Sequence, residues 1–493
     1  MRTKTMLSID EEKVMGQEEL VDIEANTRTH LGIIFTPTSD HSSQSFPPQK
    51  EEATVLHKFL RYPAPGSLTI KSTSWLDGVR GVAALGVYMF HAMGCWARIV
   101  PAWHADADQN NILQLPILRT FFVSGGAAVS LFFVISGYVL THRSLRWMRA
   151  GSAHRVPPAV ASSMFRRGFR LYLPPVLLTF CEMLSTRCGF VPGYNFTFVP
   201  ESSFFAQFVD WISETYHLIS PIYNFKRAMQ GFITHPKYDA VVWTIPLEFY
   251  GSFVCYILLL ILVWIPNDGA RMGLVALLSI SSMSMGSWNI FCFLSGMLIA
   301  DFNLSQEENG TVSSTMPRIR GIAWTAVFAT AFYVAGFPTL MVGEAHLKPM
   351  PGFEILRSLT PTALYMQDHS RFWWSISGVA LLLSISQLPR LRSIFETYFC
   401  QYLGKISFSL YLVHLFSLVL FGLKFQEFLM RVAGLQPHAN TLLYWAVCGV
   451  WYFVFTLLVF AVAGQVERWV DVPSVRFAKW LEAKCLSMCR DKQ

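Results

Sequence analysis

Long apolar stretches with almost no charged residues recur along this chain from about residue 76 to residue 465. About 20 consecutive apolar residues are enough for a helix to cross the hydrocarbon core of a bilayer. Charged residues make up only 14% of the chain, whereas a typical soluble domain carries about 25%. The sequence therefore predicts an all-α fold, a polytopic membrane helix bundle, and a soluble enzyme is the poorer interpretation.

We expect about 10 transmembrane helices, of which the fifth and sixth are short enough to be tilted or broken. Their predicted ranges are 76–97, 119–141, 168–187, 243–265, 271–287, 288–302, 319–338, 372–389, 403–424 and 441–465. The sequence predicts three parts: a disordered cytoplasmic segment over residues 1–70, a transmembrane domain over residues 71–466 and a basic cytoplasmic tail over residues 467–493.

Basic residues near the ends of the spans predict the orientation, because Lys and Arg accumulate on the cytoplasmic side of membrane proteins. The second connection holds six arginines, and the tail after residue 467 is also basic. Both termini should then be cytoplasmic, in the endoplasmic reticulum or another endomembrane. The connection 188–242 should be lumenal, and with it the glycosylation sequon at Asn195.

Other classes of site find little support in the sequence. The nine cysteines are scattered and form no close doublets of the kind that bind zinc, so we expect no metal. No contiguous basic run suggests nucleic acid as a partner. The extreme N-terminus lacks a basic region followed by an apolar core, which argues against a cleavable signal peptide.

Arg80 and His91 lie on one apolar helix, although ionisable groups inside a membrane span are expensive and usually functional. Eleven residues at about 100° each return the helix to within roughly 20° of its starting direction. The two side chains therefore leave the same face, roughly 16 Å apart along the axis. A fixed cation and a titratable imidazole share that face.

Five segments, taken together, resemble the membrane-bound acyltransferase-3 family. They are L-D-G-V-R-G-V-A-A-L-G-V-Y-M-F-H at 76–91, S-G-G-A-A-V-S-L-F-F-V-I-S-G-Y-V-L at 124–140, F-R-R-G-F-R-L-Y-L-P-P at 165–175, W-T-I-P-L-E-F-Y at 243–250 and L-G-K-I-S-F-S-L-Y-L-V-H at 403–414. The resemblance covers about residues 75–465, and the first two segments together make it specific. Ser130 stands where bacterial relatives often have an acid, so no role of that acid is carried over.

The resemblance implies an enzyme that transfers an acyl group, usually acetyl from acetyl-CoA, to a hydroxyl group. It implies that His91 is the catalytic residue and that Arg80 and Glu248 support it. It also implies supporting roles for Arg166, Arg167 and Arg170, with His414 as an additional candidate. Acetyl-CoA would be a cosubstrate, and no tightly bound cofactor is expected.

The chemistry of these residues leaves alternatives open. Transfer to an alcohol needs a base, and a neutral imidazole is the usual choice, but His91 could also merely hydrogen-bond a neighbouring helix. Glu248 follows Pro246 in the first turn of its predicted helix, where a carboxylate either meets the helix dipole or orients the imidazole of His91. The three arginines are either orientation signals or ligands of the phosphates of coenzyme A. His414 is either a packed histidine or a site residue.

We interpret the chain as an integral membrane O-acyltransferase that takes an acyl-CoA donor and a small-molecule hydroxyl acceptor. Nothing the size of a fused hydrolase-like domain follows residue 465, and the segment around 200–235 is rich in aromatic residues. Together these two features favour an apolar secondary metabolite, such as a polyketide or terpenoid, over a sugar or glycan as the acceptor. The rival interpretations are a transporter of a small molecule or acyl group and an acyl exporter. The sequence leaves the oligomeric state open.

The predicted topology is tested by the variant Asn195→Gln. Because Asn195 is the sequon expected on the lumenal side, this substitution should remove any glycan that an endoglycosidase releases from the protein. The measurement is the shift in electrophoretic mobility on enzyme treatment. A glycan at Asn309, which we place in the cytoplasm, would invert the topology.

Overall fold

The computed structural model describes residues 70, 72–97, 99–105, 110–190, 198–310, 317–341, 349–365, 367–436 and 441–490. Throughout these ranges the regular secondary structure is helical, and the pairing of Met341 with Asp368 is an isolated bridge. The predicted all-α fold is therefore confirmed. Apart from residue 70, the predicted N-terminal segment lies outside the described residues, as does Asn195.

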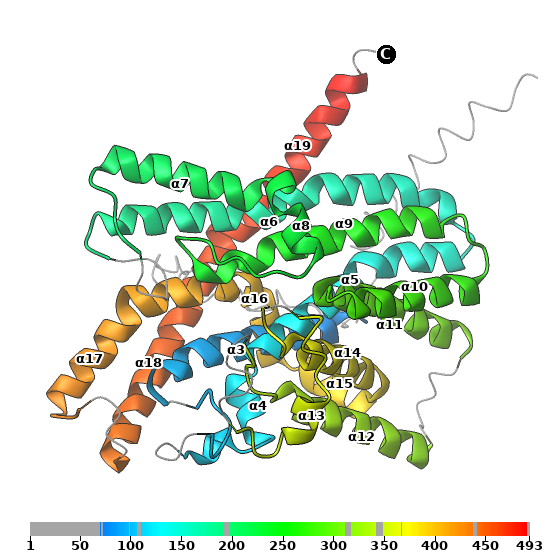
Figure 1. The fold of residues 1–493 in the computed structure, drawn as a ribbon. Coiled ribbons are helices and arrows are strands. Elements are labelled where there is room, and N and C mark those ends of the chain that lie inside the picture. The colour runs from blue at the N-terminus through cyan, green and yellow to red at the C-terminus, as the bar shows by residue number, and fades with distance from the viewer. Residues whose placement is uncertain are drawn as a thin grey trace, which may run out of the picture. The chain divides into compact units, whose positions relative to one another are not determined.

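A helix occupies each range that the sequence predicts to span the membrane (Figure 1). These helices are α3 (Ser74–Ala97), α5 (Gly125–Arg149), α6 (Val156–Thr186), α9 (Thr244–Leu262), α10 (Asp268–Ser284), α11 (Trp288–Glu308), α12 (Arg318–Ala335), α14 (Arg371–Gln387), α16 (Tyr398–Ser417) and α18 (Leu442–Val466). By length and composition, five helical stretches of the described chain could cross a membrane, or six if α14 and the helix bent from it by 105° form one span. The chain thus has the helices of a membrane protein, and about 10 crossings stays a prediction.

Shorter helices connect or extend these. They are α4 (Leu118–Val123), α7 (Phe204–Ile219), α8 (Pro221–Met229), α13 (Glu354–Ser358), α15 (Pro389–Phe395), α17 (Leu423–Val432) and α19 (Val472–Arg490), with the short turns η1 (Ile112–Gln114), η2 (Ala153–Arg155) and η3 (Ala240–Trp243). Two π-helical turns, η4 (Leu418–Gly422) and η5 (Glu467–Asp471), continue α16 and α18.

Helix α6 begins 12 residues before the predicted start of the third span at residue 168. Its first turn contains Pro157 and Pro158, which suit the start of a helix because their missing amide hydrogens would have no partner there. The interior pair Pro174 and Pro175 does not end the helix. Part of the basic connection that the sequence assigns to a loop is therefore helical.

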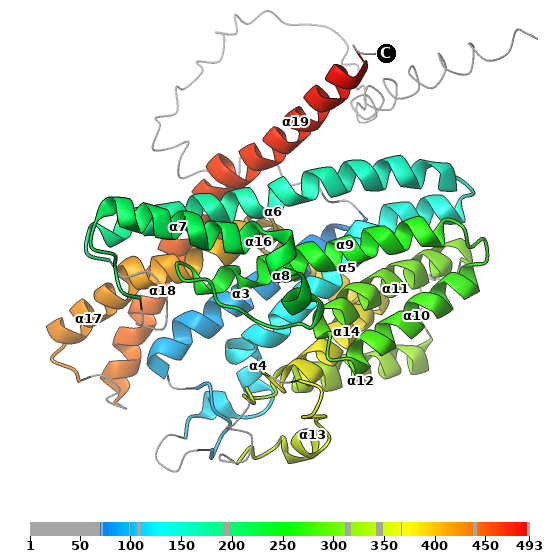
Figure 2. The same cartoon turned by 45° about the horizontal axis from the view of Figure 1, so that its top comes forward.

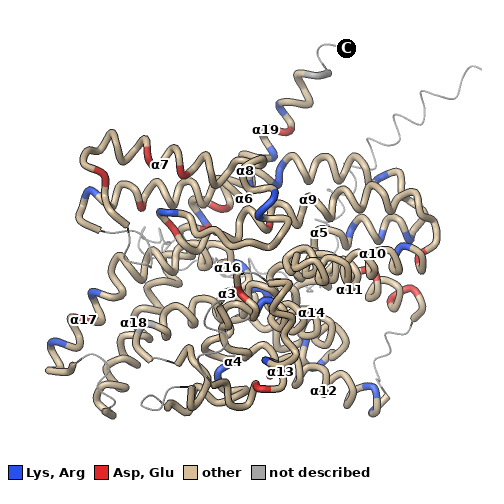
Figure 3. The backbone as a smooth tube through the Cα atoms, viewed as in Figure 1, with Lys and Arg blue, Asp and Glu red and all other residues tan. Residues whose placement is uncertain are grey.

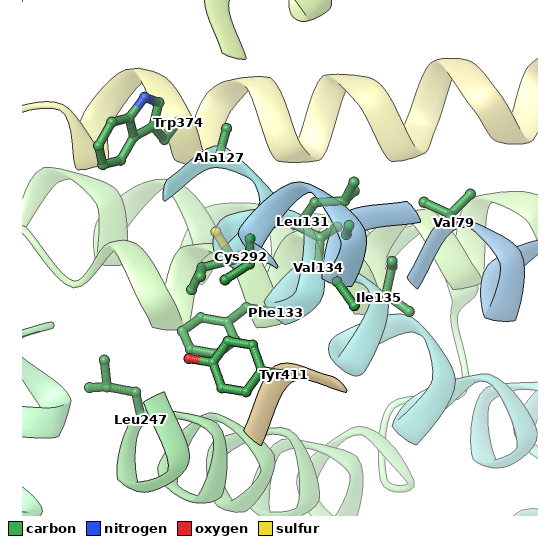
Figure 4. Close-up of a cluster of buried hydrophobic side chains, with 14 of the residues drawn as sticks. Val79, Ala127, Leu131, Phe133, Val134, Ile135, Leu247, Cys292, Trp374 and Tyr411 are labelled. Atoms are coloured by element: carbon green, nitrogen blue, oxygen red, sulfur yellow. The ribbon is translucent and has the colours of Figure 1, made fainter. Parts of the chain in front are cut away.

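Helix α3 is surrounded by other helices and contacts α4, α5, α15, α16 and α18 (Figure 2). Helix α5 adds contacts with α9, α11 and α14, while α6 packs against α9, α7 and α19. The side chains between these helices form one large hydrophobic cluster. Part of this cluster is drawn in Figure 4, where Leu131, Phe133 and Val134 of α5 are shown with Val79 of α3 and Tyr411 of α16.

Two glycines allow α5 and α11 to pack with their backbones almost in contact. A Cβ atom on Gly137 would overlap the backbone of Phe293, and one on Gly296 would overlap the backbone of Val134. Small residues at such crossings are typical of membrane helix pairs, in which close backbone approach supplies van der Waals contact. The α5–α11 crossing is thus specified by residues that a larger side chain cannot replace.

We predict that Gly137→Ala destabilises the protein by about 1–3 kcal/mol, because the added methyl group overpacks this crossing. Gly273→Ala in α10 is the matched control, since a Cβ atom there meets no atom within 4 Å. It should be neutral or slightly stabilising, because alanine favours a helix more than glycine does. Thermal unfolding of both variants in detergent makes the comparison, and equal stability of the two would contradict a close-packed crossing.

Candidate functional site

A cavity of about 170 Å³ lies between α3, α5, α6, α9 and α16, and η5 also contributes to its wall. Ionisable side chains are sparse along the helices as a whole (Figure 3), yet six of them line this one space: Arg80, Arg167, Arg170, Lys405, Glu248 and Asp471. Four are basic and two are acidic. The wall of this cavity, hereafter the cationic cavity, therefore carries an excess of basic over acidic side chains.

Arg80 reaches this cavity from the crossing of α3 and α16. Its Nε donates to the hydroxyl of Ser407 at 3.0 Å, and its Nη2 donates to the carbonyl of Gly404 at 3.1 Å. It also pairs with Asp77, one turn earlier on α3, at 3.0 Å. A Cβ atom on Gly81 would overlap the backbone of Gly404, so the helices touch at this point. These contacts hold the guanidinium in a defined position.

Glu248 is bound to Arg167 of α6. Arg167 donates from Nη2 to Oε1 of Glu248 at 2.8 Å and from Nε to the hydroxyl of Ser252 at 3.0 Å. Ser136 of α5 donates to the same carboxylate oxygen at 3.4 Å. Because α9 begins at Thr244, Glu248 lies in the second turn of this helix, and its predicted place in the first turn is wrong. The ion pair joins α6 to α9 along the cavity wall.

The other two arginines of α6 differ in their surroundings. Arg170 lines the cavity, while Arg166 pairs with Glu482 of α19 at 3.3 Å and is not among the lining residues. Lys405 and Asp471 also line the cavity, although neither is among the site residues predicted from the sequence. Lys405 belongs to the 403–414 motif, which could have drawn attention to it, but Asp471 follows the last predicted span and carries no comparable signal.

His91 and His414 form a pair about three turns along α3 and α16 from Arg80. The Nδ1 atom of His91 lies 3.1 Å from Nε2 of His414, and the ring centroids are 5.0 Å apart. The Nδ1 atom of His414 lies 3.1 Å from the carbonyl oxygen of Leu410. His414 is 1% exposed. The structure therefore joins the first-helix histidine to the additional candidate, which the sequence alone could not do.

These contacts define one arrangement of protons when both rings are neutral. A carbonyl oxygen only accepts, so Nδ1 of His414 carries the hydrogen and its Nε2 accepts from Nδ1 of His91. The carbonyl of Val87, 3.1 Å from Nδ1 of His91, can share that hydrogen. The lone pair of His91 is then on Nε2, the nitrogen that can take a proton from another group.

Tyr411 lies between the cationic cavity and the histidine pair. It lines the cavity, and its ring centroid is 6.0 Å from that of His414. Its hydroxyl is 2.8 Å from both the hydroxyl of Thr244 and the carbonyl oxygen of Val241. His91 is not among the lining residues of the cavity. Tyr411 therefore contacts both the cationic cavity and the surroundings of the histidine pair.

The described residues contain no group of three or more His, Cys, Asp or Glu side chains arranged to hold a metal ion. Seven cysteines whose side chains the structure describes are free thiols, and four of these are buried: Cys255, Cys292, Cys400 and Cys448. The ionisable residues that converge are thus arginines, a lysine, two carboxylates and two imidazoles. Such a set can bind an anion and move a proton.

Comparison with known proteins identifies relatives over most of the chain. The family whose description reads acyltransferase domain, acyltransferase-3, matches residues 73–463. The O-acetyltransferase PaAT-1 of Phomopsis amygdali is 28% identical, over 93% of this chain and 90% of its own length. The acyltransferase clz18 of Cochliobolus lunatus is 24% identical, over 85% of this chain and 96% of its own length. No solved structure matches significantly.

Proposed function

This chain belongs to the acyltransferase-3 family, and from that premise we propose that it transfers an acetyl group from acetyl-CoA to a hydroxyl group of a small molecule. The observation that carries this proposal is the placement of a cationic cavity and a histidine pair on the same two helices, α3 and α16. The naming of one relative as an O-acetyltransferase supports both the acetyl group and the oxygen acceptor.

The cationic cavity is the proposed site of the donor. Coenzyme A brings a pyrophosphate and a ribose phosphate, and guanidinium groups bind phosphate oxygens through paired, charge-assisted hydrogen bonds. Arg170 and Arg167 line the cavity and suit this role, with Arg80 beside them. Arg166 is the least suited of the α6 arginines because it does not line the cavity and pairs with Glu482 of α19. The roughly 16 Å between Arg80 and His91 along α3 fits a donor with its phosphates far from its thioester.

His91 is the proposed general base. Its Nε2 takes the proton of the acceptor hydroxyl as the oxygen attacks the thioester carbonyl, and the same proton then goes to the departing thiolate of coenzyme A. His414 positions the ring and holds its hydrogen on Nδ1 through the 3.1 Å contact. The same nitrogen would attack first if the reaction passed through an acyl-histidine intermediate.

The acceptor and the compartment form a separate part of the proposal. We place the enzyme in an endomembrane, with both termini in the cytoplasm and acetyl-CoA entering from that side. The acceptor we favour is an apolar secondary metabolite, a polyketide or terpenoid, over a sugar or glycan. The aromatic segment supports this choice, because α7 exposes Phe204, Phe205 and Tyr216. An apolar acceptor would partition into the bilayer beside such a surface.

We predict that His91→Ala lowers acetyl transfer by about 10²–10⁴-fold, the usual contribution of a general base. The assay measures release of coenzyme A from acetyl-CoA by the purified protein with extracts of the producing cell, and mass spectrometry identifies the acetylated product. His217→Ala in α7 is the control, because this histidine stacks on Tyr223 away from the cavity. Near-normal turnover by folded His91→Ala would remove His91 from the mechanism.

We also predict that Arg170→Ala raises the KM for acetyl-CoA about tenfold or more while changing the KM for the acceptor much less, because the lost contacts are to donor phosphates. Arg155→Ala is the control, since this arginine lies in η2 and does not line the cavity. Steady-state kinetics with each substrate varied in turn separates the two constants. An unchanged donor KM would leave Arg170 as an orientation signal only.

A further inference from the structure

A second cavity, of about 120 Å³, lies where α3 and α12 begin, where α5 and α11 end, and where α14 bends into α15. It is distinct from the cationic cavity described above. Helix α5 separates the two spaces, because Ser136 and Val139 line the first and Tyr138 and His142 line the second. None of the residues assigned to donor binding or to proton transfer lines this second cavity.

Three arginines from three different helices converge on this space: Arg146 of α5, Arg320 of α12 and Arg392 of α15. The acidic residue in its wall is Glu307, which lies 3.6 Å from Arg146 in a pair whose side chains are both more than half exposed. Arg320 donates to the neutral amide oxygen of Gln387 at 3.3 Å. The positive charge of the cavity is therefore only partly compensated by its own wall.

Arg392 also pairs with Glu396, one turn later, at 4.0 Å, and neutral groups provide the further contacts of Arg392 and Arg320. The guanidinium of Arg392 stacks over the ring of Trp75 at 5.3 Å and donates to the carbonyl of Ser72 at 3.4 Å. The amide of Gln387 that receives Arg320 is itself anchored, because its nitrogen donates to Oδ1 of Asn303 at 3.0 Å. Arginines that serve only as orientation signals need no such common cavity or fixed partners.

We propose that this second cavity binds a phosphate group. A phosphate supplies several acceptor oxygens and negative charge, which match three converging guanidinium groups better than any neutral ligand does. Trp75 and the stacked pair of Tyr138 and His142 supply flat surfaces for whatever the phosphate is attached to. The phosphate has two sources with the same chemistry, the nucleotide end of a coenzyme and the headgroup of an anionic lipid. The site does not depend on the proposed acetyl transfer.

Two double variants of the full-length protein test this site. The first, Arg320→Gln with Arg392→Gln, removes two cavity arginines. The matched control, Arg318→Gln with Arg390→Gln, removes two arginines from the same helices that do not line the cavity. Binding of adenosine 3′,5′-bisphosphate is measured by calorimetry in neutral detergent. For phosphatidic acid, the protein is reconstituted into phosphatidylcholine bilayers with and without phosphatidic acid. The amount of phosphatidic acid that stays bound to the protein after it is purified again is then measured.

We expect the cavity variant to bind one of the two probes about tenfold more weakly or worse, because each arginine contributes charge-assisted hydrogen bonds. The control should stay within about twofold of the wild type. Loss confined to the bisphosphate identifies a nucleotide, and loss confined to phosphatidic acid identifies a lipid headgroup. Equal binding of both probes by wild type, variant and control overturns the proposal.

Thermal unfolding of each protein accompanies these measurements. If the cavity variant does not fold, the single variants Arg320→Gln and Arg318→Gln make the same comparison. Arg170→Ala, which alters the first cavity, separates the two sites, since phosphate binding at the second cavity should survive it. A failure of this proposal leaves acetyl transfer untouched, because every readout is binding and none is turnover.

Discussion

The crossing of α3 and α16 is the contact on which the candidate site depends. At one end, Gly81 meets the backbone of Gly404, and the guanidinium of Arg80 is bound to the carbonyl of Gly404 and the hydroxyl of Ser407. About three turns further along both helices, His91 meets His414. The two helices therefore run parallel, and their register at the glycines sets the register at the imidazoles.

The parallel packing of α3 against α16 fixes the relative position of the two imidazoles. A one-residue slip of α16 against α3 would turn its side chains by about 100° and separate the imidazoles. The glycine contact opposes such a slip, because the slip would bring Leu403 or Lys405 to the position of Gly404, where a Cβ atom would overlap the backbone of Asp77. Gln401 adds a second restraint, since its amide donates to the carbonyls of Ser74 and Phe395 at 2.8 Å each. Packing at the cationic end thus positions the proton-transfer end.

The cationic cavity holds charged side chains in a buried environment, where the loss of hydration makes a charge unfavourable. Arg167 is only 11% exposed, and its pairing with Glu248 compensates part of the desolvation that a buried guanidinium suffers. The remaining excess of basic over acidic side chains in the wall attracts an anion, and an apolar bundle around it strengthens that attraction. Asp471 completes the wall from η5, beyond residue 463, where the match to the family ends.

The sequence alone determined the helical class, because long uncharged apolar stretches permit few other structures. It also determined that Arg80 and His91 share one face, because helical periodicity relates residues within one helix. The sequence also determined the family, because each motif that identifies it lies within one segment of the chain. Only the tertiary structure decided which helices meet: His91 with His414, Glu248 with Arg167, Arg166 with Glu482, and Asp471 with the cavity. These pairings depend on side-chain packing between helices that can be more than 300 residues apart, and periodicity along one helix carries no information about its partner.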